Sequence, residues 1–264
     1  MKRKVHAILK HAKIALSDLP DMDARKAVLI SAICFMIAGQ ANALADQGRR
    51  DSAKTPSLQE LAGNPPAPMS LEERNDLKIM RRLQRERTPE EMAETWLYVD
   101  LDFGPFSRAL GFDIERKAPS LARGMKTILS KLDKTASELK LKHQRTRPYL
   151  KYPDLEPCLP TENSFSYPSR HATWYTAAAE LLSTLFPEKR QQLTDIGRKA
   201  SLSRVICGVH YPSDVEAGAR MGQAAAGQIK KSLEWERLKL EYAAQDNKKP
   251  LQPVEGKDLP SLKR

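Results

Sequence analysis

Prolines stand at the start of several long segments in which apolar residues recur at helical spacing. A proline fits the first turn of a helix, because the N–H that it lacks would have no partner there and its fixed φ suits the helix. No segment alternates apolar and polar residues with a period of two. The pattern therefore predicts an all-α fold, a single-domain helical bundle. The prolines that mark predicted helix starts are Pro89, Pro168, Pro187 and Pro212.

Composition and the spacing of apolar residues divide the chain into parts. Residues 46–69 are polar and end in prolines, which predicts an extended Pro-rich arm, and 70–245 form the domain. Residues 150–167 hold prolines and no apolar period, so we predict a loop there. The Lys/Pro-rich residues 246–264 are expected to form a flexible tail. We expect helices from Ser70, from Pro89, over 120–145, 168–185 and 187–205, and from Pro212 toward Ala244.

The longest apolar run, residues 27–38, has about 12 residues, whereas a spanning helix needs about 20. Arg25 and Lys26 precede the run, and small residues at Ala43 and Ala45 follow it, as in a secretory signal peptide. We therefore expect 1–45 to be a signal peptide region, with Met22 as a candidate true start. The expected mature chain is periplasmic and has no membrane span. A buried helix or an uncleaved anchor is the alternative.

The composition allows a folded domain and suggests an anionic partner. Hydrophobic residues make up 41%, which suffices for a core, and the formal net charge is +11. Residues 46–264 contain two cysteines, Cys158 and Cys207, which could pair in an oxidising compartment. Two free buried thiols are the alternative.

Lys140 and Arg147 are seven residues apart in a segment that Pro148 follows. Seven residues are nearly two helical turns, so we expect both cations on one face at the end of a helix. Such a pair could hold a tetrahedral anion. A solvated basic helix end, favoured by the helix dipole, is the alternative.

The segment Tyr167 to Thr173 places a proline, a serine and a histidine at a predicted helix start. The first N–H groups of a helix lack partners within it, so they can bind an anion. Ser169 adds a hydroxyl, and His171 could donate a proton to a bound group. An ordinary helix cap with a surface histidine is the alternative.

The segment Ser203 to Asp214 carries Arg204, His210 and Asp214 around Gly208 and Pro212. Arg204 offers a planar fork to anion oxygens. Asp214 lies in the first turn of the helix that Pro212 opens. Its carboxylate could accept a hydrogen bond from one ring nitrogen of His210, which would leave the other nitrogen free as a nucleophile. An N-terminal acid and a packed histidine are the alternative. No Cys/His cluster with zinc-ligand spacing appears, so we expect no structural zinc. We also expect no other metal and no cofactor.

In this order, K-x6-RP, PSxH and SR-x5-H-x3-D resemble the PAP2 phosphatase superfamily. Within this superfamily the chain resembles the bacterial class A non-specific acid phosphatases, because it also has a Pro-rich segment at 65–68 and a matching cysteine pair, Cys158 and Cys207. The resemblance implies a helical fold and hydrolysis of small phosphomonoesters without a metal.

The resemblance also implies roles for individual residues. His210 would attack phosphorus, Asp214 would orient His210, and His171 would protonate the leaving group. The family usually has glycine where this chain has Arg170, whose side chain we expect to point away or to the rim. The implied phosphate-binding residues are Lys140, Arg147, Ser169, Arg170 and Arg204.

Other readings stay open at this point. A lipid phosphatase of the same superfamily or an enzyme like the vanadium haloperoxidases would share the motifs. A basic nucleic-acid-binding protein would fit the charge and would bind with steep salt dependence, but it leaves His171, His210 and Asp214 without a role. We therefore expect no nucleic-acid partner, and the sequence leaves a homo-oligomer, the substrate and the pH optimum undecided.

Overall fold

The computed structural model describes residues 56–246, and within this range it contains helices and no strand, which confirms the all-α prediction. The predicted signal region, the first part of the arm (46–55) and nearly all of the tail (247–264) lie outside the described residues. The elements are α3 (Leu58–Ala62), α4 (Leu71–Glu86), α5 (Pro89–Thr95), η2 (Trp96–Tyr98), α6 (Gly104–Leu110), α7 (Ile114–Lys117), α8 (Pro119–His143), α9 (Pro148–Lys151), α10 (Arg170–Leu185), η3 (Pro187–Lys189), α11 (Arg190–Ile206), α12 (Pro212–Ile229) and α13 (Leu233–Asp246).

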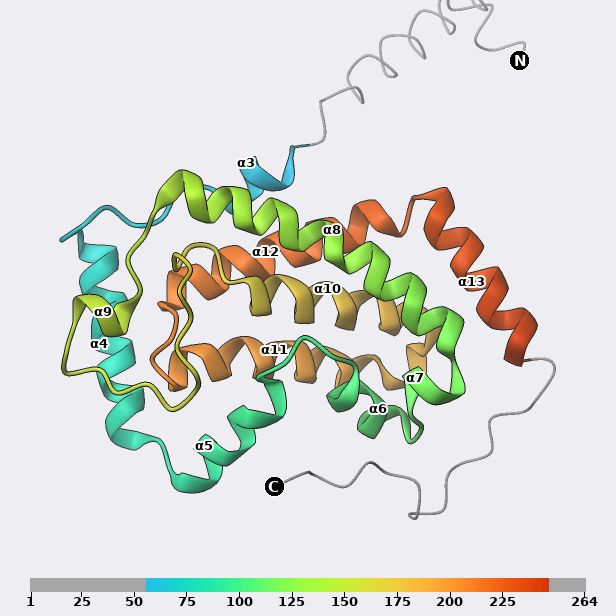
Figure 1. The fold of residues 1–264 in the computed structure, drawn as a ribbon, viewed down its shortest axis with the longest axis horizontal. Coiled ribbons are helices and arrows are strands. Elements are labelled where there is room, and N and C mark those ends of the chain that lie inside the picture. Colours follow the sequence, from blue (N-terminus) through green and yellow to red (C-terminus); the bar gives the residue numbers. More distant parts are fainter. Residues whose placement is uncertain (1–55, 247–264) are drawn as a thin grey trace, which may run out of the picture. The chain divides into compact units, whose positions relative to one another are not determined.

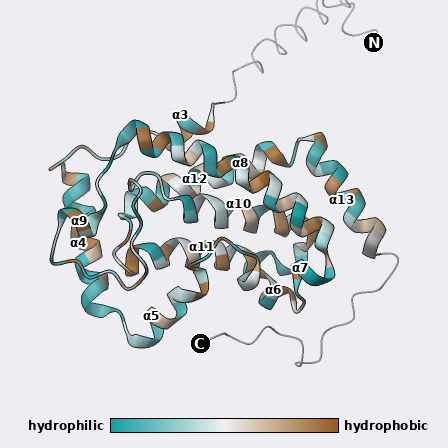
Figure 2. Cartoon of the chain, in the orientation of Figure 1, coloured by the Kyte–Doolittle hydropathy of each residue, from teal (hydrophilic) through white to brown (hydrophobic). Residues whose placement is uncertain are grey.

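Helix α10 lies in the middle of the bundle, where it packs against α8, α11 and α12 (Figure 1). It is buried on most of its surface, and Trp174 and Tyr175 pack against Phe106 of α6. Helix α8 instead has one apolar side, and polar and apolar residues alternate along it in Figure 2. Each large apolar side chain buried in this core stabilises the fold by about 1.5–3 kcal/mol. The predicted apolar stripe of α8 is buried as expected: Leu121, Met125, Ile128, Leu129, Leu132 and Leu139.

Two glycines let α12 approach α10 closely. A Cβ atom at Gly218 would collide with the carbonyl oxygen of Ser169, and one at Gly222 would collide with that of Thr173. Because neither residue has a side chain, the backbones come close enough for the Ser169 amide to donate to the Asp214 carbonyl at 2.9 Å. The beginnings of α10 and α12 are therefore held together.

Two predicted helix boundaries were wrong. Pro168 does not open α10, because it precedes the cap, Ser169, and the helix begins at Arg170. The helix expected from Pro212 toward Ala244 is two helices, since α12 ends at Ile229 and Ser232 caps α13 by accepting from the Trp235 amide at 3.2 Å. The break lets Trp235 turn into the core, where it is buried.

The predicted arm also contains a short helix, α3. Ser57 and Glu60 form a capping box, in which each side chain accepts from the other residue's backbone N–H. This S-x-x-E pattern is a local signal for a helix start. The hydroxyl of Tyr167 donates to the carbonyl of Ala62, so α3 is tied to the segment that precedes α10.

Candidate active site

The three sequence segments meet at one end of α10, at the C-terminal end of α8 and the α11–α12 connection (Figure 1). The loop 152–169 completes the cluster, because it contacts each of the other parts through hydrogen bonds. The predicted residues that are buried here are Lys140, Arg147, Ser169, His171, Arg204, His210 and Asp214. Burial of this many ionisable groups requires that they be paired or neutral.

Lys140 and Arg147 come together, but they do not share a helix face as predicted. Helix α8 ends at His143, Gln144 turns the chain with φ 46°, and Pro148 opens α9 with Arg147 as its N-cap. The two side chains meet because both donate to the loop. Lys140 Nζ donates to the Phe165 and Ser166 carbonyls, and Arg147 Nε donates to the Ser164 carbonyl at 2.8 Å.

Glu162, which the sequence analysis missed, links two of the predicted phosphate-binding residues. Its Oε2 accepts from Arg147 Nη2 at 2.9 Å, and its Oε1 accepts from Arg204 Nη2 at 3.0 Å. Nothing in the local sequence indicates this role, because the partners are 15 and 42 residues away.

The neighbours of His210 determine which of its nitrogens carries the proton. Arg147 Nη1 lies 3.1 Å from Nε2, and a guanidinium can only donate, so Nε2 presents its lone pair. Nδ1 lies 3.3 Å from Asp214 Oδ2, which can only accept when ionised, so Nδ1 carries the proton. Burial, followed by the charges of Arg147 and Lys140, lowers the pKa of His210 well below its usual value. The ring is therefore neutral, and its Nε2 lone pair faces Arg147.

Asp214 is fully buried and receives several hydrogen bonds. Its Oδ2 accepts from the Tyr211 amide at 2.9 Å and from the Ser166 hydroxyl, as well as facing His210. Its Oδ1 accepts from Arg145 Nη1 at 2.6 Å. The predicted contact between Asp214 and His210 is present, and four partners hold the carboxylate in place.

Arg145 and Asp76 extend this network and were both missed from the sequence. Arg145 Nη2 lies 3.1 Å from Asp76 Oδ2, and the guanidinium also stacks 3.8 Å from the Tyr211 ring centroid. Asp76 Oδ1 accepts from the Ser213 amide at 3.1 Å. Helix α4 is thereby connected to the carboxylate beside His210.

His171 is buried, and only one of its two ring nitrogens has a hydrogen-bond partner. Nε2 lies 2.9 Å from the Val99 carbonyl oxygen, so Nε2 carries the proton, whereas Nδ1 has no partner in the described structure. Burial, followed by the charge of Arg204, lowers the pKa of His171 to about 3. The imidazole is therefore neutral in the unliganded protein above that pH.

Ser169 and Arg170 begin α10. Ser169 is the N-cap, and its hydroxyl accepts from the Ala172 amide at 3.4 Å. Arg170 is half-buried, and its charge contributes to lowering the pKa of both Lys140 and His171. Arg170 is thus electrostatically part of the cluster, although its side chain is not enclosed by it.

The predicted pairing of Cys158 with Cys207 is present as a disulfide. Cys207 is the C-cap of α11, and Cys158 belongs to the loop that carries Glu162. The Cys158 amide also donates to the Cys207 carbonyl at 3.2 Å. The bond holds this loop against the end of α11, where Arg204 lies.

Residues 125–237 match the model of the PAP2 superfamily. This part of the chain is similar to the PAP2 superfamily. The matched range contains the buried cations, both histidines and Asp214, whereas Asp76 lies before it. The part of α4 that supports Asp214 therefore lies outside the matched region.

Relatives with curated names share part of this chain. The non-specific acid phosphatase of Salmonella typhi is 42% identical over 93 residues, which are 33% of this chain and 36% of that protein. That of Providencia stuartii is 30% identical over 139 residues, or 50% of this chain and 56% of that protein. The chain thus spans between about a third and somewhat over half of these relatives.

A solved structure has the same fold. The transmembrane PAP2-type phosphatidylglycerolphosphate phosphatase from Bacillus subtilis aligns with a TM-score of 0.50 and 23% identity, covering 66% of this chain and 90% of that one. Within residues 56–246, no helix is long and apolar enough to cross a membrane. The described part also contains no group of three or more His, Cys, Asp or Glu residues placed to hold a metal ion.

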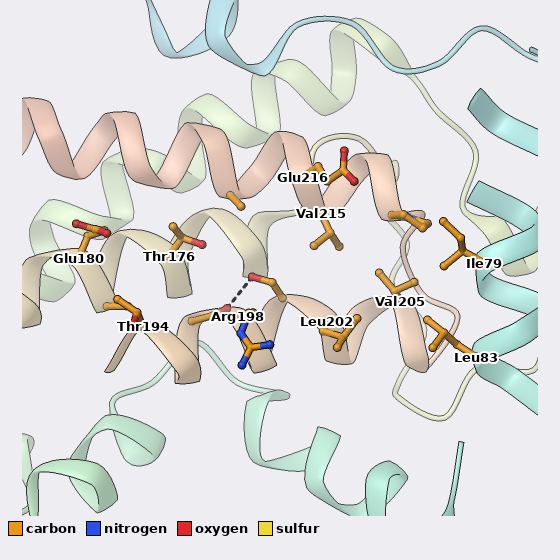
Figure 3. Close-up of a pocket in the computed structure, with 15 residues that line it drawn as sticks. Ile79, Leu83, Thr176, Glu180, Thr194, Arg198, Leu202, Val205, Val215 and Glu216 are labelled. Carbon is orange, nitrogen blue, oxygen red and sulfur yellow. Dashed lines mark hydrogen bonds between the residues drawn. The ribbon is translucent and has the colours of Figure 1, made fainter. Parts of the chain in front are cut away.

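A separate pocket of about 530 Å³ lies between α10, α11, α12 and α4 (Figure 3). Leu202 and Val205 of α11 face Val215 of α12 across it, and its lining is mainly apolar. None of the buried cations or histidines lines this pocket. This pocket is therefore separate from the cluster of buried cations and histidines.

Proposed function

We propose that this protein hydrolyses phosphate monoesters through a phosphohistidine intermediate on His210. The observation that carries the proposal is the arrangement around the Nε2 lone pair of His210. This nucleophile is neutral, it faces Arg147, and Asp214 holds the opposite ring nitrogen. Acid phosphatase relatives that are similar to part of this chain support the same reaction class.

In the first proposed step, Nε2 of His210 attacks phosphorus. The P–N bond forms while the bond from phosphorus to the leaving oxygen breaks, and the leaving oxygen takes a proton from Nδ1 of His171. In the second step, water attacks phosphorus, the P–N bond breaks, and His171 accepts the proton of the water. Asp214 stabilises the positive charge that develops on the His210 ring.

The buried cations would stabilise the phosphoryl oxygens in both steps. Arg147 contacts Nε2 of His210, and the charges of Lys140 and Arg204 act on the same ring with little screening because these side chains are buried. Ser169 and the first N–H groups of α10 would add neutral donors. His171 is neutral in the unliganded protein, with its proton on Nε2. Before it can act as the acid, Nδ1 must therefore take a second proton, either from the substrate or from solvent once the bound anion has raised the pKa of His171.

We place this reaction in the periplasm. The disulfide between Cys158 and Cys207 supports an oxidising compartment, where such bonds persist. Small phosphomonoesters are the proposed substrates.

The turnover of p-nitrophenyl phosphate tests the proposed function. We expect hydrolysis between about pH 4 and 8 that persists in EDTA, because protein cations would neutralise the phosphoryl charge. Hydrolysis confined to lipid phosphates in detergent micelles would instead favour a lipid phosphatase. Bromide oxidation in vanadate and peroxide, without phosphatase turnover, would favour an enzyme like the haloperoxidases.

Lys140→Arg is expected to extend phosphate binding to higher pH. Burial, followed by the charge of Arg147, lowers the pKa of Lys140 to about 7, so raising the pH through that value removes its charge. Arginine stays charged over this range. The Kd for inorganic phosphate, measured from about pH 6 to 9, should rise less in the variant. Identical profiles would contradict the assignment, and the ratio of the two profiles removes the ionisation of phosphate itself.

A further inference from the structure

The Glu162 carboxylate lies between the two arginines on which the proposed phosphoryl site depends. Each of its oxygens is bound by a different guanidinium, at 2.9 Å from Arg147 and 3.0 Å from Arg204. Both arginine side chains are at most 2% exposed, whereas that of Glu162 is 25% exposed. The carboxylate thus reaches from a partly exposed loop into the buried cation cluster.

The electrostatics show that this position favours a negative charge. Burial opposes ionisation of Glu162, but nearby positive charge, that of Arg147 first and that of Arg204 as well, outweighs it and lowers the pKa to about 2. In return, the Glu162 charge acts to raise the pKa of Lys140, His171 and Arg204. The carboxylate is ionised at any pH at which the protein would work.

The surrounding groups can bind more oxygen atoms than one carboxylate offers. Nε and Nη1 of Arg204 are buried without a hydrogen-bond partner in the described structure. Buried donors of this kind are costly unless a ligand satisfies them. The carboxylate of Glu162 satisfies only some of the donors in this site. A tetrahedral oxyanion has more oxygens than a carboxylate, so it could also accept from the donors that remain.

We propose that Glu162 is an internal anion, which occupies the phosphoryl position of the unliganded protein and is displaced when a phosphoryl group binds. The inference rests on the proposed function, since it assumes that the phosphoryl group binds between Arg147 and Arg204. Both anions cannot use the same guanidinium groups, because like charges at contact distance repel. Glu162 therefore lowers the affinity of the site for every oxyanion.

The displacement requires the same free energy whichever oxyanion enters. Removal of the carboxylate should therefore lower the dissociation constants of inorganic phosphate, vanadate and substrate by one common factor. For the substrate, KM should fall by this factor while kcat is unchanged, which is the signature of a change in uniform binding. A residue that acted on the transition state would change kcat.

The test compares Glu162→Gln with Glu156→Gln, using the full chain in a chloride buffer at about pH 5.5, below the pKa of Lys140. Glu156 is an exposed carboxylate in the same loop, so its replacement changes the net charge equally. Titration calorimetry with inorganic phosphate should give a Kd at least about tenfold lower for Glu162→Gln. Glu156→Gln should bind phosphate like the parent.

Thermal melting gives a second readout that does not depend on turnover. Glu162→Gln leaves two buried arginines with fewer partners, so we expect a lower melting temperature in chloride and a larger increase on addition of phosphate than in the parent. An unchanged or weaker phosphate affinity in Glu162→Gln would overturn the inference and leave the proposed function standing. If neither the parent nor the variants bind phosphate or hydrolyse p-nitrophenyl phosphate, the proposed function fails, and the inference fails with it.

Discussion

Replacing His210 by alanine is expected to lower kcat for p-nitrophenyl phosphate by about 10⁴-fold or more, because a nucleophile acts as a unit with its partners. The Nε2 lone pair facing Arg147 would be lost, and the P–N bond could not form. Steady-state kinetics of the purified variant at the pH optimum of the parent measure the loss. Phosphate binding should be retained in the variant, because the cations remain.

His143→Ala is the matched control for this prediction. His143 is in the last turn of α8 and contacts the Tyr167 ring rather than the cation cluster. We expect its kcat to stay within about threefold of the parent, as for a substitution outside the reacting groups. If His210→Ala kept more than about a tenth of the parental kcat, His210 would not be the nucleophile.

Replacing Arg145 by methionine is expected to destabilise the fold by about 3–5 kcal/mol, because it leaves the buried carboxylates of Asp76 and Asp214 without their shared partner. Urea denaturation monitored by tryptophan fluorescence measures the difference. Turnover should also fall, because Asp214 loses a hydrogen bond that holds it beside His210. Adding Asp76→Asn to the variant should restore part of the stability, since it removes one of the two uncompensated charges.

Arg81→Met is the control for Arg145→Met. Arg81 also makes a two-pronged ion pair, with Asp154 at 2.7 Å and 3.0 Å, but both side chains are at least 44% exposed. Exposed pairs contribute about 0–1 kcal/mol, so the control should lose little stability. A loss below about 1 kcal/mol in Arg145→Met would show that the buried network is not needed for the fold.

Local features of the sequence predicted much of the helical framework. The caps at Ser70 and Thr88 begin helices where predicted, and the apolar stripe of α8 is buried. These signals are local, because a cap or a stripe depends on residues within a few turns of one another. The same holds for His210 and Asp214, which are four residues apart and in contact.

The predictions failed where one local rule was extended over too long a segment. A helical face was expected to bring Lys140 and Arg147 together, but Gln144 ends the helix between them. The loop carbonyls of residues 164–166 bring them together instead. Pro168 likewise has the residue type of a first turn, yet it lies before the cap, Ser169.

By itself, the sequence determined the all-α class, most helix starts and the residue types of the anion site, because these depend on neighbours along the chain. Only the tertiary structure decided that Arg145 joins Asp76 to Asp214, and that Glu162 lies between Arg147 and Arg204. The partners of Arg145 are 69 residues away in either direction. No local pattern encodes such a pairing, since it is the packing of α4, α8 and α12 that brings the charges within reach of one another.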